Sequence, residues 1–251
     1  VVALFPEGTT EKQDTDVMAE INETASHVGI SVAGCHTEIT PGLDRPIIMV
    51  TAIGSGDSFV TSGNGKEGDS ILLTKTAGIE GSSILAKLPA VAKMVEAGTR
   101  KRAQNLIEKL SILREASVAF QTGKVHAMHD VTEGGVLGSL LEMSIASKLG
   151  FRLDREKVPI DPSTVDICSK LGIDPLRLIG SGSLLIACTK IDSSEVIAEL
   201  KAAKISCTEI GTFLPSSSDR LLVSGNHRER LSSDSVQDEL WPMLGKYGNV
   251  S

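Results

Sequence analysis

The sequence predicts a mixed fold of the α/β or α+β class, and three observations lead to this prediction. Short apolar runs typical of strands alternate with amphipathic stretches typical of helices. A chain of 251 residues can bury about seven tenths of its extended surface, which is enough for a real hydrophobic core. The sequence holds neither an internal repeat nor a dinucleotide-binding βαβ fingerprint, so the class stays open between α/β and α+β.

Each expected element follows from its own residue pattern. Apolar runs predict strands at 1–5, 30–33, 47–53, 71–74, 125–128, 151–153, 183–188, 206–213 and 220–224. The run at 47–53 is continuously apolar, so we expect this strand to be buried on both faces. Amphipathic patterns predict helices at 15–28, 78–97, 99–120 with a break near Ser111, 136–149, 162–171 and 192–203. A shorter amphipathic piece lies at 236–244.

Residues 54–69 mark the expected boundary between two domains. The stretch TSGNGKEGD at 61–69 holds three glycines and little apolar content, which is typical of a linker. We therefore expect a small N-terminal domain at 1–60, an α/β domain at 68–225 and a polar C-terminal tail at 226–251.

The composition narrows the classes of partner. The net charge of −7 argues against a protein that binds phosphate backbones, and an aromatic content of 3% leaves few stacking platforms. Apolar runs stay below the ~20 residues that span a bilayer, so neither nucleic acid nor membrane is expected. Four cysteines, at positions 35, 168, 188 and 207, form no CxxC pair. They favour a cytoplasmic protein with reduced thiols, without disulfides or zinc.

The stretch HDVTEGG at 129–135, between an apolar strand and an amphipathic helix, is the first candidate site. Gly134 and Gly135 allow close approach of the backbone, and the start of the following helix offers free N–H groups to a phosphate. Asp130 and Glu133 could hold Mg²⁺ beside that phosphate. The alternative is a purely structural helix start, with Thr132 as its cap.

A second strand-to-helix turn, KTAGIEGS at 75–82, could also bind an anion. Lys75 would supply a point charge, and Gly78 and Gly81 would supply backbone N–H groups. The spacing is not that of a P-loop. A tight structural turn is the alternative interpretation.

The run GCHTE at 34–38 contains potential metal ligands and a potential nucleophile. His126 and His129 could add to a zinc site. Neighbouring Cys35 and His36 would point to opposite faces of a strand, however, so we expect neither zinc nor a catalytic Cys35.

Four stretches resemble the aminoimidazole ribonucleotide (AIR) synthetase superfamily. They are GDSILLTKTAGIEG at 68–81, MHDVTEGGVLG at 128–138, SGSLLIA at 181–187 and GCHTEITPG at 34–42. The similarity covers about residues 1–225. The residues of these motifs are similar to those of the hydrogenase-maturation branch, or to those of synthetase-related proteins that belong to no assigned branch.

This resemblance implies ATP- and Mg²⁺-dependent activation of a small-molecule substrate, by phosphoryl transfer to an oxygen of that substrate. It also implies a homodimer and a partial N-terminal domain for dimerisation and ATP binding at 1–60. Lys75, Gly78, Gly81, Thr132, Gly134 and Gly135 would bind the nucleotide, and Asp130 and Glu133 would bind metal. His36 stands where relatives often have a carboxylate.

Superfamily members carry a further N-terminal segment with a glycine-rich loop and an acidic metal-binding motif, which this sequence lacks. We therefore expect residues 1–251 alone to bind ATP weakly or not at all. The alternative function is a truncated, catalytically silent dimer that binds a ligand or a partner.

Overall fold

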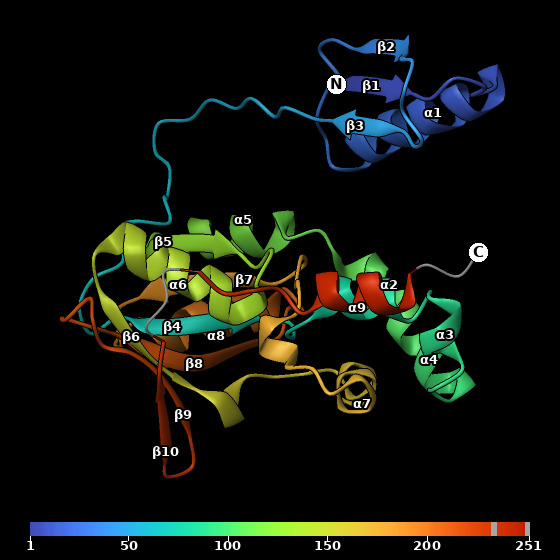
Figure 1. The fold of residues 1–251 in the computed structure, drawn as a ribbon. Helices are drawn as coiled ribbons and strands as arrows, with labels where there is room; N and C mark the ends of the chain where they lie inside the picture. The colour runs from blue at the N-terminus through green and yellow to red at the C-terminus, as the bar shows by residue number, and fades with distance from the viewer. Residues whose placement is uncertain (232–234, 249–251) are drawn as a thin grey trace. The chain divides into compact units, whose positions relative to one another are not determined.

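A computed structural model describes residues 1–231 and 235–248 of the chain (Figure 1). The chain divides into two compact units, Val1–Ser58 and Phe59–Ser251. Both units combine helices with a sheet, so the expected α/β class is confirmed. Among the described residues, no helix is both long and apolar enough to cross a membrane.

The first unit is a small sheet with one helix. Its strands are β1 (Val2–Phe5), β2 (His36–Ile39) and β3 (Ile47–Met49), in the order β2-β1-β3. Strand β1 pairs parallel to β2 and antiparallel to β3. Helix α1 (Glu11–His27) begins with a capping box, in which Thr10 and Gln13 each satisfy a backbone N–H of the other.

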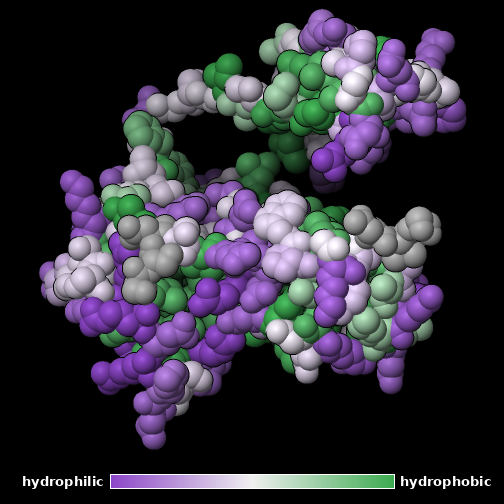
Figure 2. Space-filling view, viewed as in Figure 1, coloured by the Kyte–Doolittle hydropathy of each residue, from purple (hydrophilic) through white to green (hydrophobic). Residues whose placement is uncertain are grey.

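Two strand predictions for this unit are wrong. Residues 30–33 form no strand, and pairing with β1 starts only at His36. The expected buried strand at 47–53 is a strand only over Ile47–Met49, and its side chains are exposed. An apolar pattern predicts burial, but no other element of the first unit covers this part of the sheet. Figure 2 shows apolar, green side chains on the surface of this unit.

The second unit is built on a seven-stranded sheet of the described residues, in the order β10-β9-β6-β8-β4-β7-β5. The strands are β4 (Ser70–Thr74), β5 (Val125–Asp130), β6 (Gly150–Asp154), β7 (Leu184–Cys188), β8 (Cys207–Leu214), β9 (Arg220–Ser224) and β10 (His227–Arg230). Strand β4 lies inside the sheet and all five of its residues are buried. Strand β5 is one edge and β10 the other.

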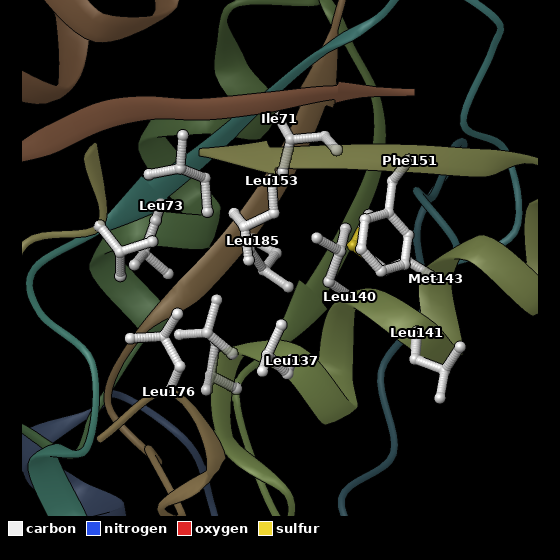
Figure 3. Packing of buried hydrophobic residues seen from close by; sticks show 14 of the residues in the cluster. Ile71, Leu73, Leu137, Leu140, Leu141, Met143, Phe151, Leu153, Leu176 and Leu185 are labelled. Carbon is white, nitrogen blue, oxygen red and sulfur yellow. The ribbon is translucent and has the colours of Figure 1, made fainter. Parts of the chain in front are cut away.

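Helices cover both faces of this sheet. On one face, Ala119 of α5 (Leu113–Gln121) and Leu200 of α8 (Ser193–Ala202) share a core cluster with Leu72 of β4. On the other face, α6 (Gly135–Ser147) packs Leu137 and Leu140 against the strands (Figure 3). Side chains alternate between the two faces of a strand, which explains why β4 contributes Leu72 to one core and its neighbours to the other.

The expected long helices over 78–120 are a series of short elements. These are α2 (Ile79–Leu85), α3 (Pro89–Ala92), α4 (Ala97–Gln104), the 3₁₀ helix η1 (Asn105–Lys109) and α5. Helix α7 (Pro162–Leu171) and α9 (Leu240–Tyr247) pack against this series. Two further 3₁₀ turns, η2 (Arg155–Lys157) and η3 (Pro175–Arg177), connect strands and helices.

The region expected as a polar tail, 226–251, contains both regular structure and buried groups. Strand β10 continues the sheet, and its exposed residues form a hydrophilic hairpin with β9 (Figure 2). Leu240 of α9 is buried beside α2 and α7. Asp238, just before α9, is only 2% exposed.

Candidate functional site

The two predicted turns lie at the same end of the sheet. Strands β4 and β5 both pair antiparallel to β7, which lies between them, so β4 and β5 run in the same direction. The turn from β4 to α2 and the turn from β5 to α6 therefore both leave the sheet at the end where these strands finish. The topology brings the two sequence motifs into one region although about 50 residues separate them along the chain.

The turn from β5 to α6 depends on glycine. Gly134 and Gly135 have φ angles of 77° and 64°, in the left-handed region that glycine adopts without strain. A Cβ on Gly135 would also lie 2.6 Å from the carbonyl oxygen of Leu176 and 2.7 Å from that of Leu178. Both glycines are thus needed for the path of the backbone, whatever else they bind.

A carboxylate of the chain itself occupies the start of α6. Asp238 Oδ2 accepts a hydrogen bond of 2.6 Å from the Gly134 N–H, and its Oδ1 accepts one of 2.7 Å from the Leu240 N–H. The carboxylate is buried and compensates the positive end of the helix dipole. The predicted phosphate position at this turn is therefore filled by an internal anion in this structure.

Sequence reasoning missed Asp238. The sequence predicts an amphipathic piece at 236–244, and Asp238 lies inside it, two residues before α9 begins. An aspartate at such a position is a typical helix start. That local pattern predicts the bond to Leu240 but not the bond to Gly134, 104 residues away. Only the tertiary fold brings α6 and the start of α9 together.

The other predicted residues of this turn have defined partners. The Thr132 N–H donates to the hydroxyl of Ser139 (3.1 Å), and the Thr132 carbonyl accepts from the Gly135 N–H (3.1 Å). The indole N–H of Trp241 donates to Glu133 Oε1. Thr132 thus takes part in the helix start through its backbone, and Glu133 connects the turn to α9.

Asp130, the last residue of β5, keeps its carboxylate in contact with solvent, with 56% of the side chain exposed. Its Oδ1 lies 3.3 Å from His129 Nδ1, but this nitrogen has no well-aligned hydrogen bond, so the contact is mainly electrostatic. His129 Nε2 contacts Glu142 of α6 at 3.0 Å. Interaction with His129 lowers the pKa of Asp130, and Asp130, followed by Glu142, raises the pKa of His129 against the effect of burial.

The candidate metal ligands form only part of a coordination shell. No group of three or more His, Cys, Asp or Glu side chains suited to a metal occurs within residues 1–231 and 235–248. Asp130 and Glu133 offer carboxylate oxygens, which Mg²⁺ accepts together with water and substrate phosphates. The donor chemistry thus fits Mg²⁺ held jointly with a bound phosphate, and a fully protein-bound ion does not fit.

Lys75 in the second turn is already neutralised. Its Nζ lies 2.8 Å from Glu115 Oε1 and donates to the carbonyl oxygens of Lys109 (2.9 Å) and Ser111 (2.8 Å). These partners use the three ammonium protons and tie the end of β4 to the start of α5. We predicted that the Lys75 ammonium would attract a phosphate. In this structure the buried carboxylate of Glu115, 40 positions further along the chain, neutralises it.

The glycines of the second turn serve packing. Gly78 has a φ of 67° and starts α2. A Cβ on Gly81 would lie 2.5 Å from the Leu178 side chain, and the Gly81 N–H donates to the Ile179 carbonyl at 3.0 Å. This amide is therefore not available to an anion in this structure.

The residues at 35–38 lie in the first unit. His36 and Glu38 contact each other at 3.3 Å on the exposed strand β2. Cys35 is an exposed free thiol. In the second unit, burial raises the pKa of each of Cys168, Cys188 and Cys207 to about 12, which is typical of structural thiols.

Residues 66–224 match the family model described as AIR synthase related protein, C-terminal domain. The chain is 27% identical over 181 residues to the carbamoyl dehydratase HypE of Cupriavidus necator, a match that covers 70% of this chain and 50% of that protein. It spans about half the length of the curated relatives that it matches.

Solved structures share the fold. The hydrogenase maturation protein HypE of E. coli superimposes with a TM-score of 0.76 at 20% identity, over 94% of this chain and 72% of that one. A HypE crystallised in complex with ATP superimposes with a TM-score of 0.69 at 18% identity, over 95% of this chain and 72% of that one. At these identities the likeness establishes the fold.

Proposed function

The chain belongs to the family of AIR synthase related proteins, and from this premise we propose that it binds ATP with Mg²⁺ and activates a small-molecule substrate. The activation would be a phosphoryl transfer, in which the γ-phosphorus forms a bond to a substrate oxygen and breaks its bond to ADP. A fold neighbour crystallised with ATP supports the nucleotide. Catalysis of this kind depends mainly on positioning and on charge neutralisation.

The position of Asp130 carries the proposal. This carboxylate stands at the end of β5, immediately before the glycine turn, and a lowered pKa keeps it ionised at neutral pH. Its exposure leaves coordination positions for a cation that a ligand brings with it. A hydrated carboxylate beside backbone N–H groups is a suitable place for a magnesium–phosphate pair.

The other residues would contribute in defined ways. Glu133 could join Asp130 at the metal after it releases the indole of Trp241. Gly134 could offer its N–H to a phosphate only in exchange for Asp238, because one N–H cannot fully serve both anions. Lys75, with Thr76 to Gly81, would form the opposite wall of the phosphate position. These exchanges predict weak binding by residues 1–251.

The same contacts favour a second candidate function. Asp238 fills the start of α6 and Glu115 neutralises Lys75, so both predicted phosphate positions are satisfied from within the chain. A protein that binds a ligand or partner without catalysis would have this property. Measuring ADP formation separates the two functions, since a catalytically silent protein produces no ADP from Mg²⁺–ATP in the presence of candidate substrates.

Titration calorimetry with ATP at millimolar concentration tests the proposal. We expect binding that requires Mg²⁺ and that weakens at least tenfold in Asp130→Ala. The matched control is Asp166→Ala, because Asp166 forms a simple 3.6 Å ion pair with Lys170 within α7. Equal ATP affinity in wild type and Asp130→Ala, or affinity independent of Mg²⁺, would contradict the assignment.

A further inference from the structure

A cavity of about 450 Å³ opens beside the end of β4, between η1, α5 and the turn that follows α8. Its basic lining residues are Lys75, Lys109, Arg114 and Lys204, and its acidic ones are Glu108 and Glu115. Three hydroxyl side chains, from Thr76, Ser111 and Ser206, also line it. This volume is in the range that holds small molecules.

The charges around this cavity do not balance. Lys75 and Glu115 neutralise each other at 2.8 Å. Lys109, Arg114 and Lys204 form no ion pair with any part of the chain that the structure describes, and Glu108 alone opposes them. The lining therefore carries an excess of two positive charges, in a chain whose net charge is −7.

Several cations elsewhere in the same unit are paired with carboxylates. Lys124 lies 3.2 Å from Asp192 and also contacts Glu195, and Arg155 makes a paired contact with Asp174. Like charges that line one cavity repel each other. The repulsion is stronger there than in open water, because the cavity walls reduce screening by water. An anionic ligand would remove this repulsion.

The backbone at two of these lysines adds a second observation. Lys75 and Lys204 have φ angles of 54° and 63°, and Lys148 is the only other non-glycine residue with a positive φ in the described chain. Glycine would adopt these angles with less strain. The backbone at both of these cavity lysines therefore carries a conformational cost. Backbone strain of this kind is found at ligand-binding positions.

We propose that this cavity binds the phosphate group of a small phosphorylated molecule. A phosphate monoester carries close to two negative charges at neutral pH and so matches the excess charge of the lining. Arg114 offers a planar set of donors to phosphate oxygens, and the lysines and hydroxyls offer further donors. The cavity shares Lys75 and Thr76 with the wall of the proposed Mg²⁺–ATP position, but its free cations lie on η1, α5 and the turn after α8, whereas Asp130 precedes α6.

The test uses Lys204→Gly, which removes one cation and relieves the backbone. Lys148→Gly is its control, because Lys148 also follows a helix with a left-handed φ of 58° and lies outside the cavity. Arg114→Gln has Arg100→Gln on α4 as its control. Binding of inorganic phosphate and of glycerol phosphate is measured at low and constant ionic strength, by calorimetry or by chemical-shift perturbation.

We expect phosphate affinity to fall at least fivefold in Lys204→Gly and in Arg114→Gln, and to stay within twofold of wild type in both controls. Mg²⁺–ATP binding should stay within twofold of wild type in both cavity variants, because neither Lys204 nor Arg114 belongs to the proposed nucleotide position. Equal losses in variants and controls would overturn the proposal, as would the absence of phosphate binding. Loss of Mg²⁺–ATP binding in the cavity variants would also overturn it, since the cavity would then hold the nucleotide.

Discussion

The two units of the chain differ in how they bury apolar residues. In Val1–Ser58, the buried apolar residues are Ala3, Phe5 and Ala25, while side chains such as Ile48, Met49 and Val50 are 40–64% exposed. In the second unit, core clusters fill both faces of the sheet. An apolar surface of the first kind is typical of an interface. The hydrophobic core of the second unit is sufficient to stabilise it. In the first unit, the exposed apolar side chains would be stabilised by contact with another surface.

The same difference separates the two units chemically. Potentially reactive groups of the first unit, Cys35 and His36, are exposed. Two groups of the second unit that were predicted to bind phosphate have internal partners: Lys75 contacts Glu115, and the Gly134 N–H donates to Asp238. A sequence shows the motif at 34–38 and the two glycine turns equally well. It does not show that the glycine turns have partners from distant parts of the chain.

Thiol reactivity should show the largest contrast between the units. Burial raises the pKa of the three cysteines in the second unit from 9.0 to about 12, so each has about one thousandth of the thiolate of an ordinary thiol at pH 8. We expect one fast-reacting thiol with a disulfide reagent, absent in Cys35→Ser. A second fast thiol in the native protein would show that the core of the second unit is more open than described.

Removal of the Asp238 carboxylate should destabilise the second unit strongly. Asp238→Ala loses two hydrogen bonds to a buried charged group and leaves the Gly134 and Leu240 N–H groups without this acceptor. We expect a loss of about 2–3 kcal/mol in the free energy of unfolding, measured with a chemical denaturant. Asp238→Asn keeps one acceptor and should lose less. Equal stability of Asp238→Ala and wild type would contradict the described role.

The exposed sheet of the first unit predicts self-association. We propose a homodimer in which a second copy covers Ile47–Met49, because a row of exposed apolar side chains on a sheet is an aggregation hazard when nothing covers it. Ile48→Ser should weaken the dimer about tenfold in sedimentation, a change of about 1.4 kcal/mol. Ile191→Ser, at a residue of the second unit that is 90% exposed, is the control. A monomer at all micromolar concentrations would contradict the proposal.

The His129–Asp130 contact should have the smallest effect and a defined pH dependence. The raised pKa of His129 means that its contribution is fully present below the ordinary value of 6.5 and is lost as the pH rises through the raised pKa. The lowered pKa of Asp130 means that its contribution is present above 3.8 and is lost as the pH falls through the lowered pKa. Because Asp130 is largely exposed, we expect less than about 1 kcal/mol.

Denaturation of wild type and His129→Gln, without metal or nucleotide, measures this contribution. The stability advantage of wild type should be present at pH 5.5 and absent at pH 9. An advantage that increases toward pH 9 would show that the sign is wrong.

The sequence predicted the elements whose patterns are local. The strands around Ile71 and Ala127, the helix that contains Leu137 and Leu140, and the two glycine turns lie where their periodicity and turn residues place them. Burial of 47–53 was predicted wrongly, because an apolar run indicates a need for cover and does not indicate what provides it. Glu115 and Asp238 were missed because their partners lie 40 and 104 positions away.

Amide hydrogen exchange with and without Mg²⁺–ATP tests the central claim most directly. We expect added protection at 130–135 and 76–81 in the second unit, only when Mg²⁺ and ATP are both present, and none in Asp130→Ala. Protection confined to other segments, at a nucleotide concentration that saturates binding, would contradict the assignment of these turns as the nucleotide site.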